Sequence, residues 1–235
     1  MSIAENIAAI RAKMNEAAIA ADRDPKDILL CAATKMNDAD AVRQAIAGGV
    51  DCCGENKVQE LTAKLADNAY EGAPVHFIGH LQTNKVKQVV GKVSLIHSVD
   101  SFRLLEAIQK EAARQGIRQD ILLEINIAQE ESKSGFRKEE VHAILEQMVK
   151  YPNIFVRGLM AIPPISTEPG KNTKFFQEIF NLSVDITAKT YDNVSTDFLS
   201  MGMSDDFTDA IACGSNMIRV GTAIFGARNY AKPHQ

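Results

Sequence analysis

Residues 27–54 read DILLCAATKMNDADAVRQAIAGGVDCCG, in which two short apolar runs flank one helical segment. The first run, residues 27–33, has the length and composition of a buried strand. A helix is predicted to begin at Asp38, a favourable N-cap residue, and to end at Gly48, because glycine often closes helices. A second strand follows over residues 50–54. This order is typical of two parallel strands joined by a crossover helix.

The same alternation continues along the whole chain of 235 residues. Eight such units fit a closed parallel barrel, a fold that typically needs about 250 residues. We therefore predict an α/β protein with a single (β/α)8 TIM-type barrel over residues 1–235 and an extra N-terminal amphipathic helix. An open doubly wound sheet is the alternative, but no GxGxxG motif follows the first strand. The predicted strands are residues 27–33, 50–54, 75–79, 95–99, 121–127, 156–162, 198–201 and 217–220, and the predicted helices include 38–49, 56–68, 83–90, 102–116, 138–150, 172–191 and 205–213.

Composition and charge exclude several classes of partner. The net charge of −4 argues against a basic face for nucleic acid. No apolar run approaches the ~20 residues that span a bilayer, and the N-terminus lacks a cleavable signal pattern. We therefore expect a cytoplasmic protein without nucleic-acid or membrane partners. The spacing of the four cysteines matches no zinc motif and no CxxC motif, so buried reduced thiols and no metal site are expected: Cys31, Cys52, Cys53 and Cys213.

Two loops near the C-terminus have the composition of a phosphate site. Barrels place their active sites at the carboxyl ends of the strands and often bind phosphate after strands seven and eight. After the seventh predicted strand come Ser200, Gly202 and Ser204, and after the eighth come Gly221 and Thr222. Glycine lets backbone N–H groups approach a ligand, and helix N-termini favour anions. Ordinary turns and helix caps are the alternative interpretation of each loop.

Three charged or titratable side chains face the same predicted mouth. Lys35 ends the first strand, which neighbours the eighth in a closed barrel, and a desolvated lysine can form a Schiff base. A surface lysine that merely ends a strand is the alternative. Arg219 on the eighth strand could instead form an interior ion pair with Glu124. His80 could act as a base, stack on a ring or be purely structural.

The motifs at the strand ends resemble those of the pyridoxal phosphate homeostasis proteins, which share the barrel of the alanine racemase-like enzymes that use pyridoxal 5′-phosphate (PLP). The resemblance covers nearly the whole chain. Two departures affect the loops around the site: Met36-Asn37 follows Lys35, and Cys52-Cys53 precedes Gly54. The matching motifs are ATK (33–35), GENKVQE (54–60), HFIGHLQTNK (76–85), GLMAIP (158–163), LSMGMSDD (199–206) and IRVGTAIFG (218–226).

The resemblance implies a role for each of these positions. Lys35 would hold PLP as a covalent aldimine, and Arg219 would face the pyridine nitrogen. Asn56 would border the ring near its hydroxyl group, and His80 would line the same mouth. The expected phosphate-binding residues are Ser200, Gly202, Gly221 and Thr222, and the full expected cofactor-binding set adds Met160 and Met201.

The resemblance also implies a task without catalysis, namely supplying PLP and keeping the free cofactor low, with indirect effects on amino-acid and keto-acid metabolism. A cation at the pyridine nitrogen makes PLP a weak electron sink. In the racemases the second acid/base group comes from an additional C-terminal domain, whereas only residues 227–235 follow Gly226 here. We therefore expect a monomeric carrier with no catalytic residues and with apo-PLP enzymes as possible clients. An alanine-racemase-like amino-acid racemase and a cofactor-free lysine aldolase remain alternatives.

Overall fold

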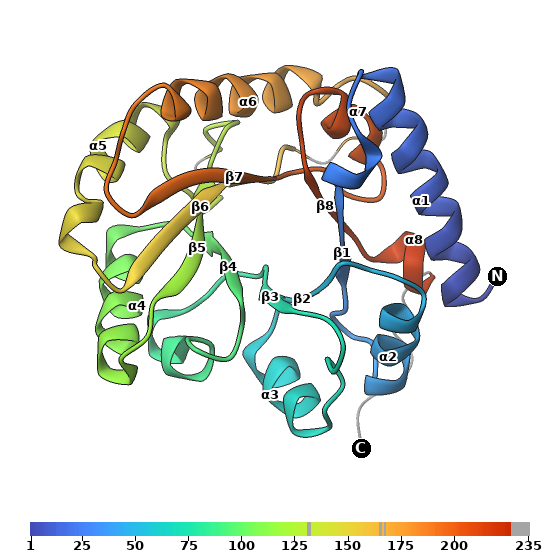
Figure 1. Ribbon diagram of the computed structural model, residues 1–235, viewed down its shortest axis with the longest axis horizontal. Coiled ribbons are helices and arrows are strands. Elements are labelled where there is room, and N and C mark those ends of the chain that lie inside the picture. Colours follow the sequence, from blue (N-terminus) through green and yellow to red (C-terminus); the bar gives the residue numbers. More distant parts are fainter. Residues whose placement is uncertain (131–132, 165, 167, 227–235) are drawn as a thin grey trace.

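The computed structural model describes residues 1–130, 133–164, 166 and 168–226. Eight parallel strands pair in chain order and close into a barrel, with β8 next to β1 (Figure 1). The predicted barrel is therefore confirmed. The strands are β1 (Leu29–Ala33), β2 (Cys52–Glu55), β3 (Val75–Phe77), β4 (Leu95–Val99), β5 (Gln119–Ile125), β6 (Ile154–Ala161), β7 (Val194–Ser200) and β8 (Met217–Val220).

Helices surround the barrel in the order that the sequence predicts. The α-helices are α1 (Ile3–Ala20), α2 (Ala39–Ala47), α3 (Val58–Ala66), α4 (Phe102–Gln115), α5 (Val141–Glu146), α6 (Thr173–Thr187), α7 (Phe207–Ala212) and α8 (Thr222–Phe225). Short 3-10 helices also occur: η1 (Pro25–Asp27), η2 (Thr83–Gln88), η3 (Lys138–Glu140) and η4 (Met148–Lys150). Among the described residues, none of the helices is both long enough and apolar enough to cross a bilayer.

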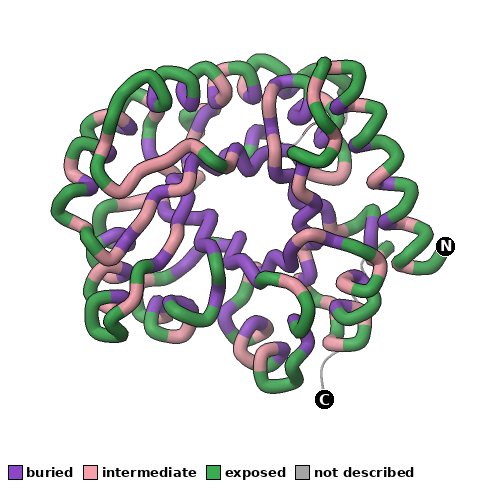
Figure 2. Tube along the Cα trace, viewed as in Figure 1, coloured by how far each residue is buried: buried purple, intermediate pink, exposed green. Residues whose placement is uncertain are grey.

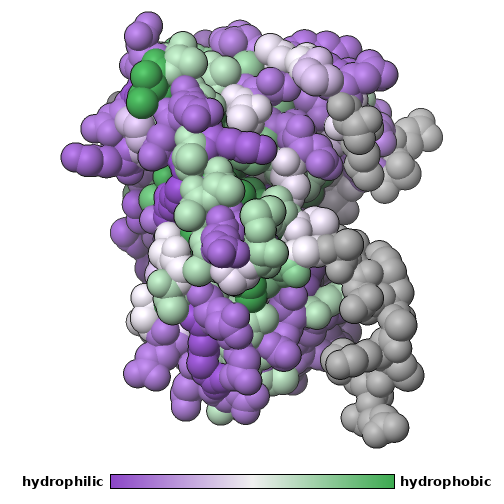
Figure 3. Space-filling view, turned by 90° about the vertical axis from the view of Figure 1, so that its right-hand side faces the viewer, coloured by the Kyte–Doolittle hydropathy of each residue, from purple (hydrophilic) through white to green (hydrophobic). Residues whose placement is uncertain are grey.

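The extra helix at the N-terminus is also confirmed. A capping box between Ser2 and Glu5 satisfies the first N–H groups of α1. Its buried residues include Ile7, Ile10 and Met14, and the Asn6 side chain donates a hydrogen bond of 2.8 Å to the carbonyl of Ile224. Thus α1 packs beside α8 at the side of the barrel where the chain closes. Several of its exposed residues are alanines, and Figure 3, which faces this side of the molecule, shows weakly hydrophobic residues in the middle of a mostly hydrophilic surface.

Strand side chains alternate between two packing layers. On β1, Leu30 and Ala32 pack in the large cluster shared with the helices, whereas Cys31 packs in a smaller cluster inside the barrel. Figure 2 shows this core as buried residues that run along the strands and the inner faces of the helices. Every second strand residue therefore points into the barrel, where a ligand or another side chain can reach it.

Predicted bounds shift by up to four residues, as at α6, which ends at Thr187 rather than at residue 191, and three further elements differ from the structure. Strand β7 begins at Val194 rather than at residue 198, because residues 195–197 are polar and leave Val194 as an isolated apolar residue. The predicted helix 138–150 is divided into η3, α5 and η4, although neither glycine nor proline marks the breaks. The predicted helix 83–90 is the 3-10 helix η2.

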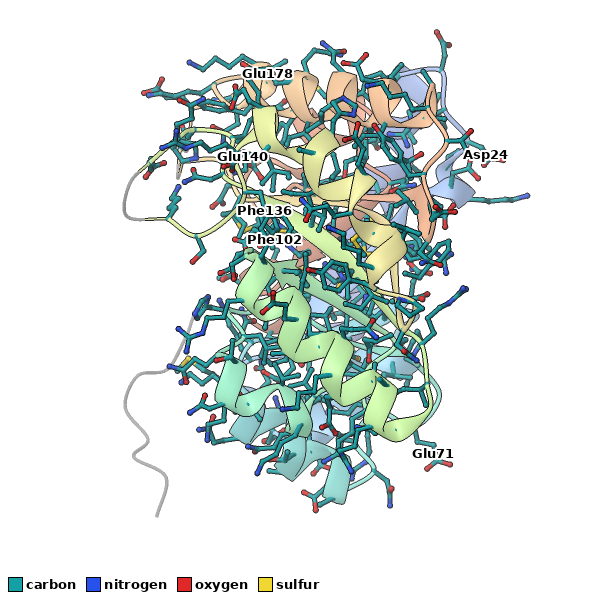
Figure 4. All side chains as sticks on the ribbon, turned by 90° about the vertical axis from the view of Figure 1, so that its left-hand side faces the viewer. Asp24, Glu71, Phe102, Phe136, Glu140 and Glu178 are labelled. Carbon is teal, nitrogen blue, oxygen red and sulfur yellow. The ribbon has the colours of Figure 1, made fainter. Side chains whose placement is uncertain are left out.

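The two ends of the barrel can be followed in Figure 4. Asp24 and Glu71, which precede β1 and β3, lie on the right, whereas Phe136 and Glu140, which follow β5, lie further left. The carboxyl ends of the strands therefore face the left of that view. We call this end the carboxyl mouth and the opposite end the amino mouth.

Candidate cofactor site

Residues far apart in the sequence meet at the carboxyl mouth because neighbouring strands are in parallel register. Ala33 pairs with Gly54, and Cys31 pairs with Arg219. A Cβ atom built on Gly221 would lie 3.3 Å from the Cβ of Ala33, so the ends of β1 and β8 lie in contact. The loops that carry Lys35 and Thr222 therefore leave the barrel side by side, as the sequence analysis predicts.

Lys35 lies in a turn two residues beyond β1 rather than on the strand itself, and its side chain is half-buried. Three hydrogen bonds fix the backbone of this turn. The N–H of Met36 donates to Glu60 Oε2 (2.6 Å), the N–H of Asn37 donates to the Thr34 carbonyl (3.2 Å), and Asn37 Nδ2 donates to the Lys35 carbonyl (3.0 Å). The backbone at Lys35 is therefore fixed by these hydrogen bonds.

A buried ion pair lies directly behind that turn. Glu55 is fully buried, and its Oε2 accepts hydrogen bonds from Lys64 Nζ (2.7 Å), Tyr70 Oη (3.2 Å) and Thr34 Oγ1 (3.1 Å). Lys64 Nζ also donates to the Thr34 carbonyl (2.8 Å). A buried carboxylate requires this degree of compensation. The network fixes the ends of β1 and β2 relative to each other, so Glu55 and Lys64 position the site without entering it.

Asn56 follows Glu55 and presents an unpaired acceptor. Its N–H donates to Glu55 Oε1 (3.0 Å), but its buried Oδ1 has no hydrogen-bond partner among the described residues. The loop after β3 packs tightly on this backbone, since a Cβ on Gly79 would lie only 2.2 Å from the Asn56 carbonyl oxygen. Buried acceptors are nearly always paired in native proteins. Asn56 Oδ1 is therefore placed to accept a hydrogen bond from a ligand.

The loop between β7 and α7 is held by a buried carboxylate. Asp206 Oδ1 accepts from the N–H of Met203 (2.7 Å), and its Oδ2 accepts from Asn172 Nδ2 (2.9 Å). Gly202 has a φ of +92°, and its carbonyl accepts from the N–H of Arg219 (3.0 Å). This left-handed conformation, which favours glycine, ties the loop to β8. The first N–H groups of α8, which begins at Thr222, have no acceptor within that helix and lie at the neighbouring strand end.

Arg219 is buried in the barrel, where its guanidinium hydrogen-bonds to residues of β6 and β7. Its Nη1 donates to Ser200 Oγ (2.6 Å) and its Nη2 to the Ala161 carbonyl (3.0 Å). Burial lowers the pKa of this guanidinium, while the negative charges of Glu124 and Asp206 act in the opposite direction. Arginine nevertheless remains charged in proteins. The ion pair between Arg219 and Glu124, considered as an alternative, is not found among the described contacts.

A cavity of about 350 Å³ opens at the carboxyl mouth. Glu124 is one of the residues that line this cavity. Burial and the charge of Asp100 raise its pKa to about 7, whereas the charge of Arg219 acts in the opposite direction. His80 is largely exposed, and its Nδ1 lies 3.3 Å from Asp100 Oδ2. Lys35 and the phosphate-loop residues lie outside this lining. The cavity is lined by Asn56, Ile78, Gly79, His80, Ser98, Glu124, Ile125, Asn126, Lys133, Ser134 and Ile162.

The structure separates the two methionines of the expected set. Met160 lies inside the barrel, opposite Ser200 in the register of β6 and β7. Met201 packs instead in the outer cluster against the helices. Its N–H donates to the Met217 carbonyl (3.2 Å), and its own carbonyl accepts from Ser215 Oγ (2.7 Å). The Met201 side chain and these backbone groups are thus engaged within the protein, and a role for Met201 in holding the cofactor stays a prediction.

Several supporting residues have no clear signal in the sequence. Glu60 acts on the site through an exposed contact with Met36, and Lys64 and Tyr70 act through buried contacts with Glu55, across 24, 9 and 15 residues of the chain respectively. The sequence indicates Glu124 only as a possible partner of Arg219, whereas its place in the cavity lining and its raised pKa come from the structure. His97 Nδ1 lies 3.0 Å from Ser200 Oγ, a contact that joins β4 to β7 across the barrel. The alternation of β4 predicts that His97 shares a face with Leu95, but not which residue lies opposite.

Comparison with known proteins agrees with this geometry. The family model for the N-terminal domain of alanine racemase matches residues 2–229. A pyridoxal phosphate homeostasis protein of Pseudomonas aeruginosa is 39% identical over 232 residues, covering 99% of this chain and 98% of that protein. One of Aquifex aeolicus is 38% identical over 230 residues, covering 98% and 100%.

A solved structure gives the same result in three dimensions. PipY of Synechococcus elongatus PCC7942, solved with PLP bound, is 31% identical and superposes with a TM-score of 0.82. The match covers 96% of this chain and 100% of PipY. The chain therefore belongs to the pyridoxal phosphate homeostasis proteins, within the wider family of the alanine racemase N-terminal domain.

Proposed function

We propose that this protein binds PLP at the carboxyl mouth and carries or buffers the cofactor in the cytoplasm, without turning over a substrate. Its relatives are named pyridoxal phosphate homeostasis proteins, and PipY was solved with PLP. The observation that carries the proposal is Arg219, a buried cation hydrogen-bonded to Ser200 in the barrel interior. The unpaired Oδ1 of Asn56 supports the fit of a ligand that can donate a hydrogen bond.

The side chains at the carboxyl mouth match the aldehyde, the ring and the phosphate group of PLP. When bound, PLP supplies an aldehyde that condenses with amines and a pyridine ring that withdraws electrons. Lys35 would form the covalent bond to the aldehyde carbon. Arg219 would face the pyridine nitrogen, and Asn56 would accept from the ring hydroxyl. The phosphate would be held by Ser200, Gly202, Gly221 and Thr222, with His80 and Met160 beside the ring.

The charge of Arg219 favours holding the cofactor over using it. A carboxylate at this position would keep the pyridine nitrogen protonated and strengthen the ring as an electron sink, whereas a guanidinium opposes protonation. Racemisation also needs acid/base groups on both faces of the substrate carbon. The His80 side chain is 61% exposed and is directed to Asp100, so it is poorly placed for that role.

A transfer experiment tests the carrier function. The loaded protein is mixed with an apo-PLP enzyme in the presence of a phosphatase that destroys free PLP, and enzyme reactivation is followed over time. We expect the loaded protein to reactivate the enzyme under conditions in which free PLP does not, and we expect a Lys35→Ala variant to lose this protection. Reactivation that the phosphatase abolishes equally for carrier and free PLP would contradict the proposal.

Two further measurements test the remaining parts of the proposal. Amino-acid racemisation by the pure loaded protein should be undetectable, and turnover that disappears in His80→Ala would contradict a non-catalytic role. Light scattering should give the mass of one chain, since we propose that the carrier is a monomer that releases PLP to apo-enzymes as its clients.

A further inference from the structure

A cluster of soft metal ligands lies inside the barrel, towards the amino mouth. Cys31, Cys52 and His76 come from the consecutive strands β1, β2 and β3, and all three are buried. One potential ligand atom from each, two thiol sulfurs and an imidazole nitrogen, lie within 4.8 Å of one another. Thiolates and imidazole together are typical ligands of zinc. The spacing of these residues along the chain matches no zinc motif because each ligand comes from a separate strand.

Access to the cluster comes from the end opposite the proposed PLP site. A second cavity, of about 260 Å³, is lined by Cys52 and His76 and also by Leu29, Leu95 and Met217. Leu29, Leu95 and Met217 are the first residues of their strands, so this cavity lies at the amino mouth. An ion could therefore reach the cluster from solvent without passing the carboxyl mouth.

Neighbouring side chains fix the orientation of the histidine. His76 Nδ1 lies 3.0 Å from His97 Nε2, which leaves Nε2 of His76 as its nitrogen for an ion. The neutral imidazole is the form that binds metals. Metal-binding histidines usually donate their other N–H to an acceptor. Here His97 can accept from His76 and donate through Nδ1 to Ser200 Oγ, which lies 3.0 Å away.

The ligand set suits a divalent ion. The two thiols and the imidazole are buried together inside the barrel. A divalent ion that displaces both thiol protons forms a neutral unit with two thiolates and one imidazole. Arg219, which pairs with Cys31 in the register of β1 and β8, is a further buried cation beside these thiolates.

We propose that Cys31, Cys52 and His76 bind one Zn²⁺ ion, with its fourth position directed to the cavity at the amino mouth. Binding forms two S–Zn bonds and one N–Zn bond, and it releases the two thiol protons to solvent. The zinc site does not require the proposed PLP function, although the two are neighbours: Cys31 pairs with Arg219 in the register of β1 and β8, and His97 joins His76 to Ser200. The expectation that the cysteines are only buried thiols is then incomplete for this pair.

Cobalt titration of the chelator-treated, reduced protein tests the proposal directly. Co²⁺ replaces Zn²⁺ in such sites, and thiolate ligands give it an intense near-ultraviolet charge-transfer band. We expect this band to saturate at one Co²⁺ per chain, to disappear on addition of one equivalent of Zn²⁺, and to accompany the release of two protons. A folded wild-type protein that gives no such band, or only bands without thiolate character, overturns the proposal.

Substitutions assign the ligands. Cys52→Ala should abolish stoichiometric binding, whereas Cys53→Ala is the matched control, because Cys53 packs in the outer cluster against the helices. Binding that survives Cys52→Ala, or that Cys53→Ala abolishes equally while circular dichroism shows a folded chain, contradicts the assignment. If Cys52→Ala does not fold, Cys31→Ser and His76→Gln provide the same comparison, and the wild-type cobalt spectrum remains decisive.

Discussion

Glu124 offers a quantitative test of how the carboxyl mouth is built. Its pKa lies at about 7 instead of the ordinary 4.5, first because burial penalises its charged form and then because Asp100 repels it. Replacing Glu124 with glutamine keeps the shape and removes the ionisation. We therefore expect the Glu124→Gln variant to be more stable than the wild type at alkaline pH.

The magnitude follows from the pKa difference. A pKa raised on folding adds stability that is fully present below the unfolded pKa and is lost as the pH rises through the folded pKa. For Glu124 this window runs from about pH 4.5 to about pH 7. A difference of about 2.5 pH units, at about 1.4 kcal/mol each, corresponds to ~3.5 kcal/mol. The advantage of the variant should be absent near pH 4 and reach ~3.5 kcal/mol by pH 8.

The assay is urea unfolding of the cofactor-free wild type and variant across this pH range. Comparing the two proteins at each pH cancels the titration of all other groups. Glu146→Gln, a change at an exposed residue of α5, serves as the control and should give no such pH-dependent difference. A Glu124→Gln advantage that is constant with pH, or that grows as the pH falls, would refute the reasoning.

Three further substitutions test the supports of the site. Lys64→Met leaves the Glu55 carboxylate buried without a cation and should lower the free energy of unfolding by about 3–5 kcal/mol in denaturant titrations. Lys57→Met is the control, because the Lys57 side chain is exposed, and it should change the free energy of unfolding little. Thr222→Ala should weaken PLP binding by about 1–3 kcal/mol in spectroscopic titrations, and an unchanged Kd would remove Thr222 from the site. Gly202→Ala should destabilise the fold by about 1–3 kcal/mol and weaken PLP binding, because the φ of Gly202 is +92° and the new Cβ would lie 2.6 Å from the Ala210 Cβ. A variant with the free energy of unfolding and the Kd for PLP of the wild type would contradict this expectation.

The sequence is sufficient to predict the order of elements because apolar runs and capping residues are local signals. Helix α4, for example, begins after Ser101 and ends at Gly116 in the left-handed conformation, as its sequence predicts. The first half of β7 is not predictable in this way, since Val194 is followed by three polar residues that are only partly buried or exposed. The breaks around α5 also depend on tertiary packing rather than on local residues.

The residues of the proposed site also fall into two groups, those that the sequence predicts and those that only the structure reveals. Residues that follow strand ends, such as Lys35 and Thr222, are predictable because the topology of a barrel brings those ends together. Their supports are not, because the contacts of Glu55 with Lys64 and of Ser200 with His97 depend on side-chain direction and burial. The direction of Met201 depends on the same alternation of the strand, by which Ser200 points inward and Met201 outward.

We propose that Lys35 holds PLP covalently at the carboxyl mouth. Borohydride reduction of the PLP-loaded protein, followed by proteolysis and mass spectrometry of the pyridoxyl-modified peptides, tests this bond. We expect one modified residue, Lys35, and loss of that modification in Lys35→Ala. Stoichiometric modification of a different lysine, or unchanged modification in the Lys35→Ala variant, would contradict it.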